Sequence, residues 1–224
     1  MSEPAAFRFA PEPPRELAVF PLPGALLLPR GRLPLNIFEN RYLHLINDAL
    51  GEGRMIGMIQ PTAAQPPLDK PDCKLFGVGC VGRLIQFSES GDGRFVITLL
   101  GVCRFRVGAE IEGRHGYRRV RPDYAGFGAD LLEDKKRLAD RPRLIKAVRA
   151  YFAARHIEGD FSGIDQAGDE FLVNSLSMAS PFLPEEKQAL LESADLQDRA
   201  DLLTALLEMA LNEPPGRPDT PARH

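Results

Sequence analysis

The chain has 224 residues, 44% of them hydrophobic, and a net charge of −3. A chain of this size can bury a core without disulfides, and its near-neutral charge argues against a strongly basic nucleic-acid-binding protein. The three cysteines, an odd number, favour a reducing compartment over a secreted disulfide scaffold.

Both ends of the chain differ from its middle. Residues 1–14 are rich in proline and glutamate, where a signal peptide needs a basic start and an apolar run, so we predict a flexible N-terminal arm and a cytoplasmic protein. No window is apolar enough for a membrane span. The composition changes near residue 122, which predicts a β-rich domain over 15–122, a helical domain over 123–212 and a disordered tail over 213–224.

Short alternating apolar runs predict strands in the β-rich domain. A Gly-Asp-Gly turn at 91–93 predicts a hairpin, and Gly101 is expected to end the second strand of that hairpin. Residues 39–50 have the apolar spacing of one amphipathic helix. The predicted strands are 17–20, 33–37, 55–59, 83–87, 95–100, 102–107 and 117–121. Many short strands with one early helix predict a small, partly closed β-barrel.

The helical domain shows apolar residues at helical spacing. Pro142 suits the first turn of one helix, and Pro184 followed by two glutamates suits the start of another. A periodic stretch over 165–178 includes Phe171 on its apolar stripe, and a last helix is expected from about residue 196. The fold class is therefore α+β, a small barrel followed by a bundle of about four helices.

Five short motifs together resemble the N-terminal substrate-binding domain of Lon proteases over roughly residues 17–210. They are F-P-L-P at 20–23, L-P-L-N-I-F-E-N-R-Y at 33–42, D-G-R at 92–94, L-L-G-V-C-R-F-R-V at 99–107 and L-P-E-E-K-Q-A-L-L-E at 183–192. Their order and spacing match that family. The resemblance implies a PUA-like β-barrel followed by a helical bundle. In the full protease, the two together form a platform that captures unfolded or tagged protein substrates.

Catalytic motifs of full-length Lon proteases are missing from the sequence. No G-x-x-x-x-G-K-[ST] phosphate loop occurs, and the serines nearest Lys187 lie in a predicted helix or at its end, without a glycine-rich oxyanion setting. The cysteines and histidines lack zinc-ligand spacing, which favours buried thiols. His44 and Asp48 lie one helical turn apart, which favours a solvated helix face over an acid/base pair. We expect a stand-alone, non-catalytic module with no cofactor or metal.

The segment 36–42 is the predicted protein-binding surface, because capture of unfolded chains requires an exposed apolar patch with a polar rim. Its candidate residues are Asn36, Phe38, Glu39, Arg41 and Tyr42. The structural alternative is that this segment closes the barrel and tethers the helix. Leu68, the only large apolar residue of the Pro-rich connection 60–74, is a second candidate. A groove between barrel and bundle is a third location for binding.

The expected partners are unfolded or tagged protein segments, or a protease or chaperone onto which the module docks, with self-association as a further option. The alternative is an RNA-binding adaptor that uses an arginine strip on the late strands, with Arg104, Arg106 and Arg119 as its phosphate contacts. Against it, no exposed aromatics alternate with these arginines for base stacking, and Glu110 and Glu112 are close by. A hydrolase with unrecognised residues is the third option.

Overall fold

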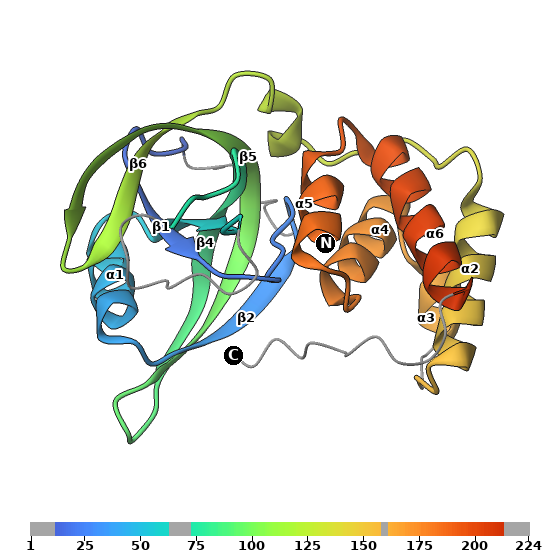
Figure 1. Cartoon of the computed structure of the whole chain (residues 1–224), viewed down its shortest axis with the longest axis horizontal. Helices are drawn as coiled ribbons and strands as arrows, with labels where there is room; N and C mark the ends of the chain where they lie inside the picture. The colour runs from blue at the N-terminus through green and yellow to red at the C-terminus, as the bar shows by residue number, and fades with distance from the viewer. Residues whose placement is uncertain (1–11, 63–72, 158–160, 213–224) are drawn as a thin grey trace, which may run out of the picture.

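A computed structural model describes residues 12–62, 73–157 and 161–212. A sheet occupies the first half of the chain and helices occupy the second (Figure 1). Most of the predicted N-terminal arm, the whole predicted tail and Leu68 lie outside the described residues.

Six strands form one mixed sheet in the order β2-β5-β4-β3-β1-β6. They are β1 Leu17–Pro21, β2 Arg32–Ile37, β3 Met55–Ile59, β4 Val78–Glu89, β5 Phe95–Arg114 and β6 Tyr117–Asp123. Strands β1 and β3 are parallel, and the other pairs are antiparallel. Strand β5 is long enough to pair with β2, β4 and also β6. All the predicted strand segments lie in strands, with 95–100 and 102–107 joined in β5, but the predicted partly closed barrel is not confirmed.

Gly101 does not end a strand, contrary to the prediction. Strand β5 runs through it, because the missing side chain lets the segment before β2 cross close to the sheet. The Gly101 amide donates to the carbonyl of Gly31 at 2.8 Å, and the Arg30 amide donates to the carbonyl of Gly101 at 2.8 Å. A Cβ at position 101 would overlap the carbonyl oxygen of Leu28. This crossing fixes the start of β2 and the position of Arg30.

Helix α1, Asn40–Gly51, covers one part of the sheet with its apolar face. Tyr42, Leu45 and Ile46 are buried, and the Tyr42 ring lies 4.2 Å from that of Phe20, centroid to centroid. Such close aromatic packing stabilises the fold beyond the contribution of burying the two rings.

Among the described residues, the second half contains five helices, where about four were predicted. They are α2 Arg141–Ala154, α3 Phe161–Gln166, α4 Asp169–Ala179, α5 Pro184–Glu192 and α6 Leu196–Asn212, preceded by a 3-10 turn, η1, at Gly128–Leu131. The stretch predicted as one helix over 165–178 is broken at Gly168, whose extended backbone precedes α4. Helix α5 starts at Pro184 as predicted, with Glu186 accepting from the Leu183 amide at 2.7 Å.

One hydrophobic core joins the sheet to the helices. It includes Leu27 and Leu35 from the first half and Leu176, Leu190 and Leu203 from the second. Helices α4 and α5 lie beside the sheet, while α2 and α3 are farther away (Figure 1). The change from strands to helices falls close to residue 122, but a division into two domains stays a prediction.

Candidate functional site

A buried polar junction lies where the sheet meets the helices. Arg104 of β5 is only 6% exposed, and its guanidinium donates to both carboxylate oxygens of Asp130 at 2.9 Å. It also donates to the carbonyls of Leu191 and Ser193 at the end of α5. Because a buried charge is costly unless paired, this arrangement fixes η1 and α5 against the sheet.

A second buried arginine extends the junction. Arg199 of α6 donates to the carbonyl of Leu190 at 2.9 Å and to Asn174 Oδ1 at 3.1 Å, and Asn174 in turn donates to the carbonyl of Pro29. Burial lowers the pKa of Arg199 to about 10, and the nearby charge of Arg104 acts in the same direction. Helix α4 is therefore tied to both α6 and the segment that leads into β2.

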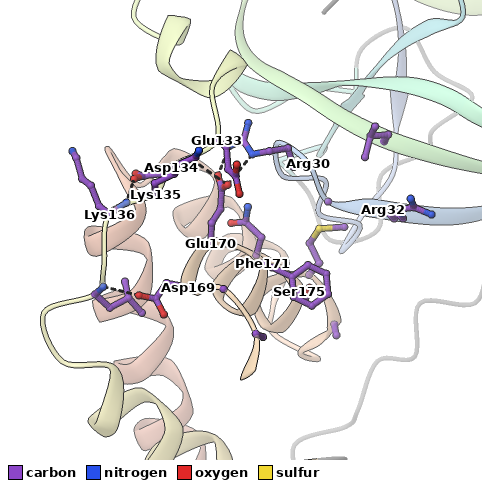
Figure 2. A pocket seen from close by; sticks show the side chains of 18 of the residues that line it. Arg30, Arg32, Glu133, Asp134, Lys135, Lys136, Asp169, Glu170, Phe171 and Ser175 are labelled. Atoms are coloured by element: carbon purple, nitrogen blue, oxygen red, sulfur yellow. Dashed lines mark hydrogen bonds and ion pairs between the residues drawn. The ribbon is translucent and has the colours of Figure 1, made fainter. Parts of the chain in front are cut away.

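An open cleft adjoins this junction, between the start of β2, helix α4 and the connection that follows η1 (Figure 2). Its volume is about 1380 Å³. Ligand pockets for small molecules usually measure about 300–1,000 Å³, so this cleft is large enough for a stretch of polypeptide.

Part of the cleft lining is apolar. Phe171 of α4 is 70% exposed and projects into the cleft, with Leu33, Leu100 and Met178 also in the lining. The prediction that Phe171 packs inward is wrong, because Leu172, Val173 and Leu176 form the buried face of α4 instead. An exposed ring with a polar surrounding is typical of an interaction site.

Two carboxylates in the first turn of α4 hold one wall of the cleft in place. Glu170 pairs with Arg30 and accepts from the amide of Asp134 at 3.3 Å. Asp169 pairs with Arg141 and accepts from the amide of Leu138 at 2.9 Å (Figure 2). The connection over 133–138 is thus attached to α4 at both ends, although it has no regular secondary structure.

A model of the family described as the ATP-dependent protease La (LON) substrate-binding domain matches residues 16–209. The chain belongs to this LON substrate-binding domain family. It is 28% identical over 204 residues to Lon protease 2 of Myxococcus xanthus and 26% identical over 204 residues to Lon protease of Anaeromyxobacter dehalogenans. Each alignment covers 87% of this chain, which spans only about a quarter of the length of these curated relatives.

Solved structures of LON family domains share the fold. The crystal structure of the Lon N-terminal domain protein from Xanthomonas campestris has a TM-score of 0.61 at 22% identity, covering 85% of this chain and 97% of its own. The N-terminal domain of the Mycobacterium avium complex Lon protease has a TM-score of 0.58 at 16% identity, covering 86% and 98%. The Lon resemblance drawn from the five sequence motifs is therefore confirmed.

The predicted binding surface of this LON domain lies away from the cleft, at the end of β2. Phe38 is 56% exposed and Asn36 is exposed, while Glu39 and Arg41 pair with each other at 2.6 Å. Tyr42 is 3% exposed, so its ring belongs to the core and offers no surface to a partner. Its burial raises the pKa of its hydroxyl to about 12. A role for the remaining four residues in binding stays a prediction.

The predicted arginine strip does not form a continuous exposed surface. Arg104 is buried in the junction, contrary to its expected place on a solvated face. Arg106 is exposed but donates to the carbonyl of Ala125 at 3.0 Å, and Arg119 pairs with Glu16 at 2.6 Å. These contacts do not favour the RNA-binding alternative.

The cysteines are free and buried, as predicted, and burial raises the pKa of Cys103 to about 11. Within the described ranges, no group of three or more His, Cys, Asp or Glu side chains is placed to hold a metal ion. In the same part of the chain, no helix is long and apolar enough to cross a membrane.

Proposed function

We propose that this LON domain binds protein segments reversibly in the cleft between β2 and α4, by apolar contact and without a covalent step. The observation that carries the proposal is the exposed Phe171 in the lining of a cleft of about 1380 Å³, in a chain of a substrate-binding family. Leaving a phenylalanine ring in water is unfavourable, and a bound chain would remove that cost.

The surroundings of Phe171 support a binding role. The buried face of α4 anchors the helix in the core, and the Arg199–Asn174–Pro29 contacts fix its position relative to β2. Binding to a rigid, preformed surface avoids the entropic cost of ordering that surface. Phe171 can therefore act as an anchor for an incoming apolar side chain.

The partner and the cellular role extend this proposal. The family resemblance supports unfolded or tagged protein segments as substrates, or docking onto a protease or chaperone, with self-association as a further option. We also propose that the protein is cytoplasmic and non-catalytic. Its sheet would form a PUA-like barrel, and the helical domain would act together with that barrel. The chain spans about a quarter of the length of its Lon relatives, so the activity of those whole proteases is not part of the proposal.

The surface around Phe38 is the competing location. Phe38 and Phe171 are the same residue type and both are largely exposed, at 56% and 70%, but only Phe171 lines the cleft. This difference provides a matched pair of variants, Phe171→Ser and Phe38→Ser.

The test is titration of a short, unstructured, dye-labelled peptide with an apolar centre against the full chain and both variants, followed by fluorescence anisotropy. We expect Phe171→Ser to weaken binding about tenfold or more, as loss of a central aromatic anchor does, and Phe38→Ser to leave it unchanged. The reverse result would transfer the site to the predicted surface at 36–41. Absence of binding to the wild-type chain would contradict the proposed function.

A further inference from the structure

We propose that the cleft selects polypeptide segments in which acidic residues flank an apolar residue. This inference rests on the proposed function and names the chemistry of its substrate. Its basis is the charged part of the cleft lining, which is distinct from the apolar part on which the proposed binding itself depends.

The lining contains six Lys or Arg residues and four Asp or Glu residues. Two of the acids, Asp169 and Glu170, are already paired with Arg141 and Arg30. That leaves four cations against two acids, a local charge of +2, although the whole chain carries −3. The cleft is therefore a positive region on an acidic protein, and it attracts acidic groups.

The four remaining cations are Arg32 on β2 and Lys135, Lys136 and Arg137 on the connection after η1. All four are exposed, and none forms an ion pair within the part of the chain that the structure describes. A partner can therefore bind these four cations without breaking an ion pair within the described residues.

Three of these cations flank Phe171. Arg32 lies on one side of Phe171, and Lys135 and Lys136 lie on the other (Figure 2). An extended segment crossing the cleft would place an apolar side chain against Phe171, with charges on either side of it near these cations. This arrangement fits an apolar residue between acidic ones.

The cationic wall is held in position by the fold. The amides of Asp134 and Leu138, on either side of the two lysines, donate to Glu170 and Asp169. The carboxylate of Asp134 also accepts from the amide of Lys136 at 2.9 Å. A preorganised backbone limits the entropy lost when the lysine side chains engage a carboxylate.

The test compares three unstructured peptides that share one apolar centre and carry an uncharged dye. Their flanking residues are Asp in the first, Ser in the second and Lys in the third. We expect the Asp peptide to bind about three- to tenfold more tightly than the Ser peptide, because exposed ion pairs contribute modestly, and the Lys peptide to bind most weakly. Raising the salt concentration should reduce these differences.

The decisive variant is the double substitution Arg32→Gln/Lys136→Gln in the full chain. It should remove the preference for Asp over Ser and leave binding of the Ser peptide intact. The matched control, Arg15→Gln/Lys74→Gln, removes two exposed cations that do not line the cleft and should keep the preference. Urea unfolding of both doubles verifies that they are folded.

The outcomes separate this inference from the proposed function. Equal binding of all three peptides, with loss of binding in Phe171→Ser, would overturn the acidic preference and leave protein binding in place. No binding of any peptide would overturn both. If an unstructured oligonucleotide binds as tightly as the Asp peptide, and Arg32→Gln/Lys136→Gln weakens both equally, the cations serve polyanions in general and the inference fails.

Discussion

The buried junction and the open cleft are adjacent regions that share Asn174 of helix α4, yet they use charge in opposite ways. In the junction, Arg104 and Asp130 are each about 7% exposed, and their charges are satisfied internally. In the cleft, Arg32 and Lys136 are exposed and have no ion pair within the described ranges. The junction can therefore stabilise the fold, while the cleft retains free surface for a partner.

Helix α4 shows the same contrast between consecutive residues. Leu172 is 3% exposed and belongs to the core, whereas Phe171 is 70% exposed in the cleft. A single helix thus anchors itself with one face and offers another face for binding. Substitutions in the two regions should accordingly separate stability from binding.

The largest effect is expected from Arg104→Ala, compared with Arg106→Ala two residues along the same strand. Removing Arg104 leaves the buried Asp130 carboxylate without its partner, and breaking a buried pair costs about 3–5 kcal/mol of unfolding free energy. Arg106→Ala should cost about 1 kcal/mol or less, because that side chain is exposed. Urea unfolding measures the free energy of unfolding of both variants. Equal losses of stability would contradict the assignment of Arg104 as buried and structural and of Arg106 as exposed.

Leu172→Ala and Phe171→Ala form the next pair. Leu172→Ala leaves a cavity in the core and should cost about 2–5 kcal/mol. Phe171→Ala removes a larger side chain but should change stability by only about 0.5 kcal/mol, since that ring is mostly in water. Thermal unfolding distinguishes them, and a large loss for Phe171→Ala would mean that Phe171 serves the core.

A smaller effect is expected from Asp169→Asn. The substitution weakens the pair with Arg141 and the hydrogen bond from the Leu138 amide, at a cost of about 1 kcal/mol. Amide hydrogen exchange should become faster over 134–138 and stay unchanged in β3, Met55–Ile59, which is remote from the substitution. Unchanged exchange at 134–138 would show that Asp169 does not hold the cleft wall.

The smallest effect concerns Asp48, outside both regions. Burial alone would raise its pKa, but hydrogen bonds with Tyr117 and His115 and the charge of Arg114 outweigh burial and lower it. The folded pKa is then below the unfolded value of about 3.9, so this stabilisation is present above that pH and is lost as pH falls through the folded pKa.

The contribution of Asp48 should stay below about 1 kcal/mol, because its two ionic partners, Arg114 and His115, are each almost half exposed. Asp48→Asn should flatten the loss of stability below pH about 4, measured by urea unfolding across a pH series. Glu112→Gln, at an exposed carboxylate, is the control. An identical acid profile for Asp48→Asn and the wild type would contradict this role of Asp48.

Much of the secondary structure was predictable from local pattern. The alternation of apolar residues located the strands, and Pro184 with its two glutamates located the start of α5. Gly101 misled the prediction, because its role is a close approach between segments 70 residues apart in sequence, such as Gly101 and Gly31. A local pattern contains no information about such crossings.

The site was harder to predict than the fold, for a similar reason. Alternation placed Arg104 and Arg106 on the same solvated face, but η1 and α5 cover only Arg104. Tyr42 is a candidate for the binding surface and also belongs to the apolar stripe of the predicted helix over 39–50, and its spacing from Leu45, Ile46 and Ala49 matches the buried face of α1. The helical spacing of Leu172, Val173 and Leu176 defines the buried face of α4, and it was the one signal in the sequence that Phe171 lies outside that face. A groove between the halves was expected, but its lining comes from four separate segments, residues 30–34, Leu100, 133–141 and 166–179.

The most direct test of the central claim is amide hydrogen exchange of the full chain with and without the Asp-flanked peptide. Binding in the cleft predicts slower exchange over 30–34, 133–138 and 169–178, with no change over 36–42. Protection confined to 36–42, or no protection at any segment under conditions where the peptide is bound, would contradict the assignment of the binding site to the cleft.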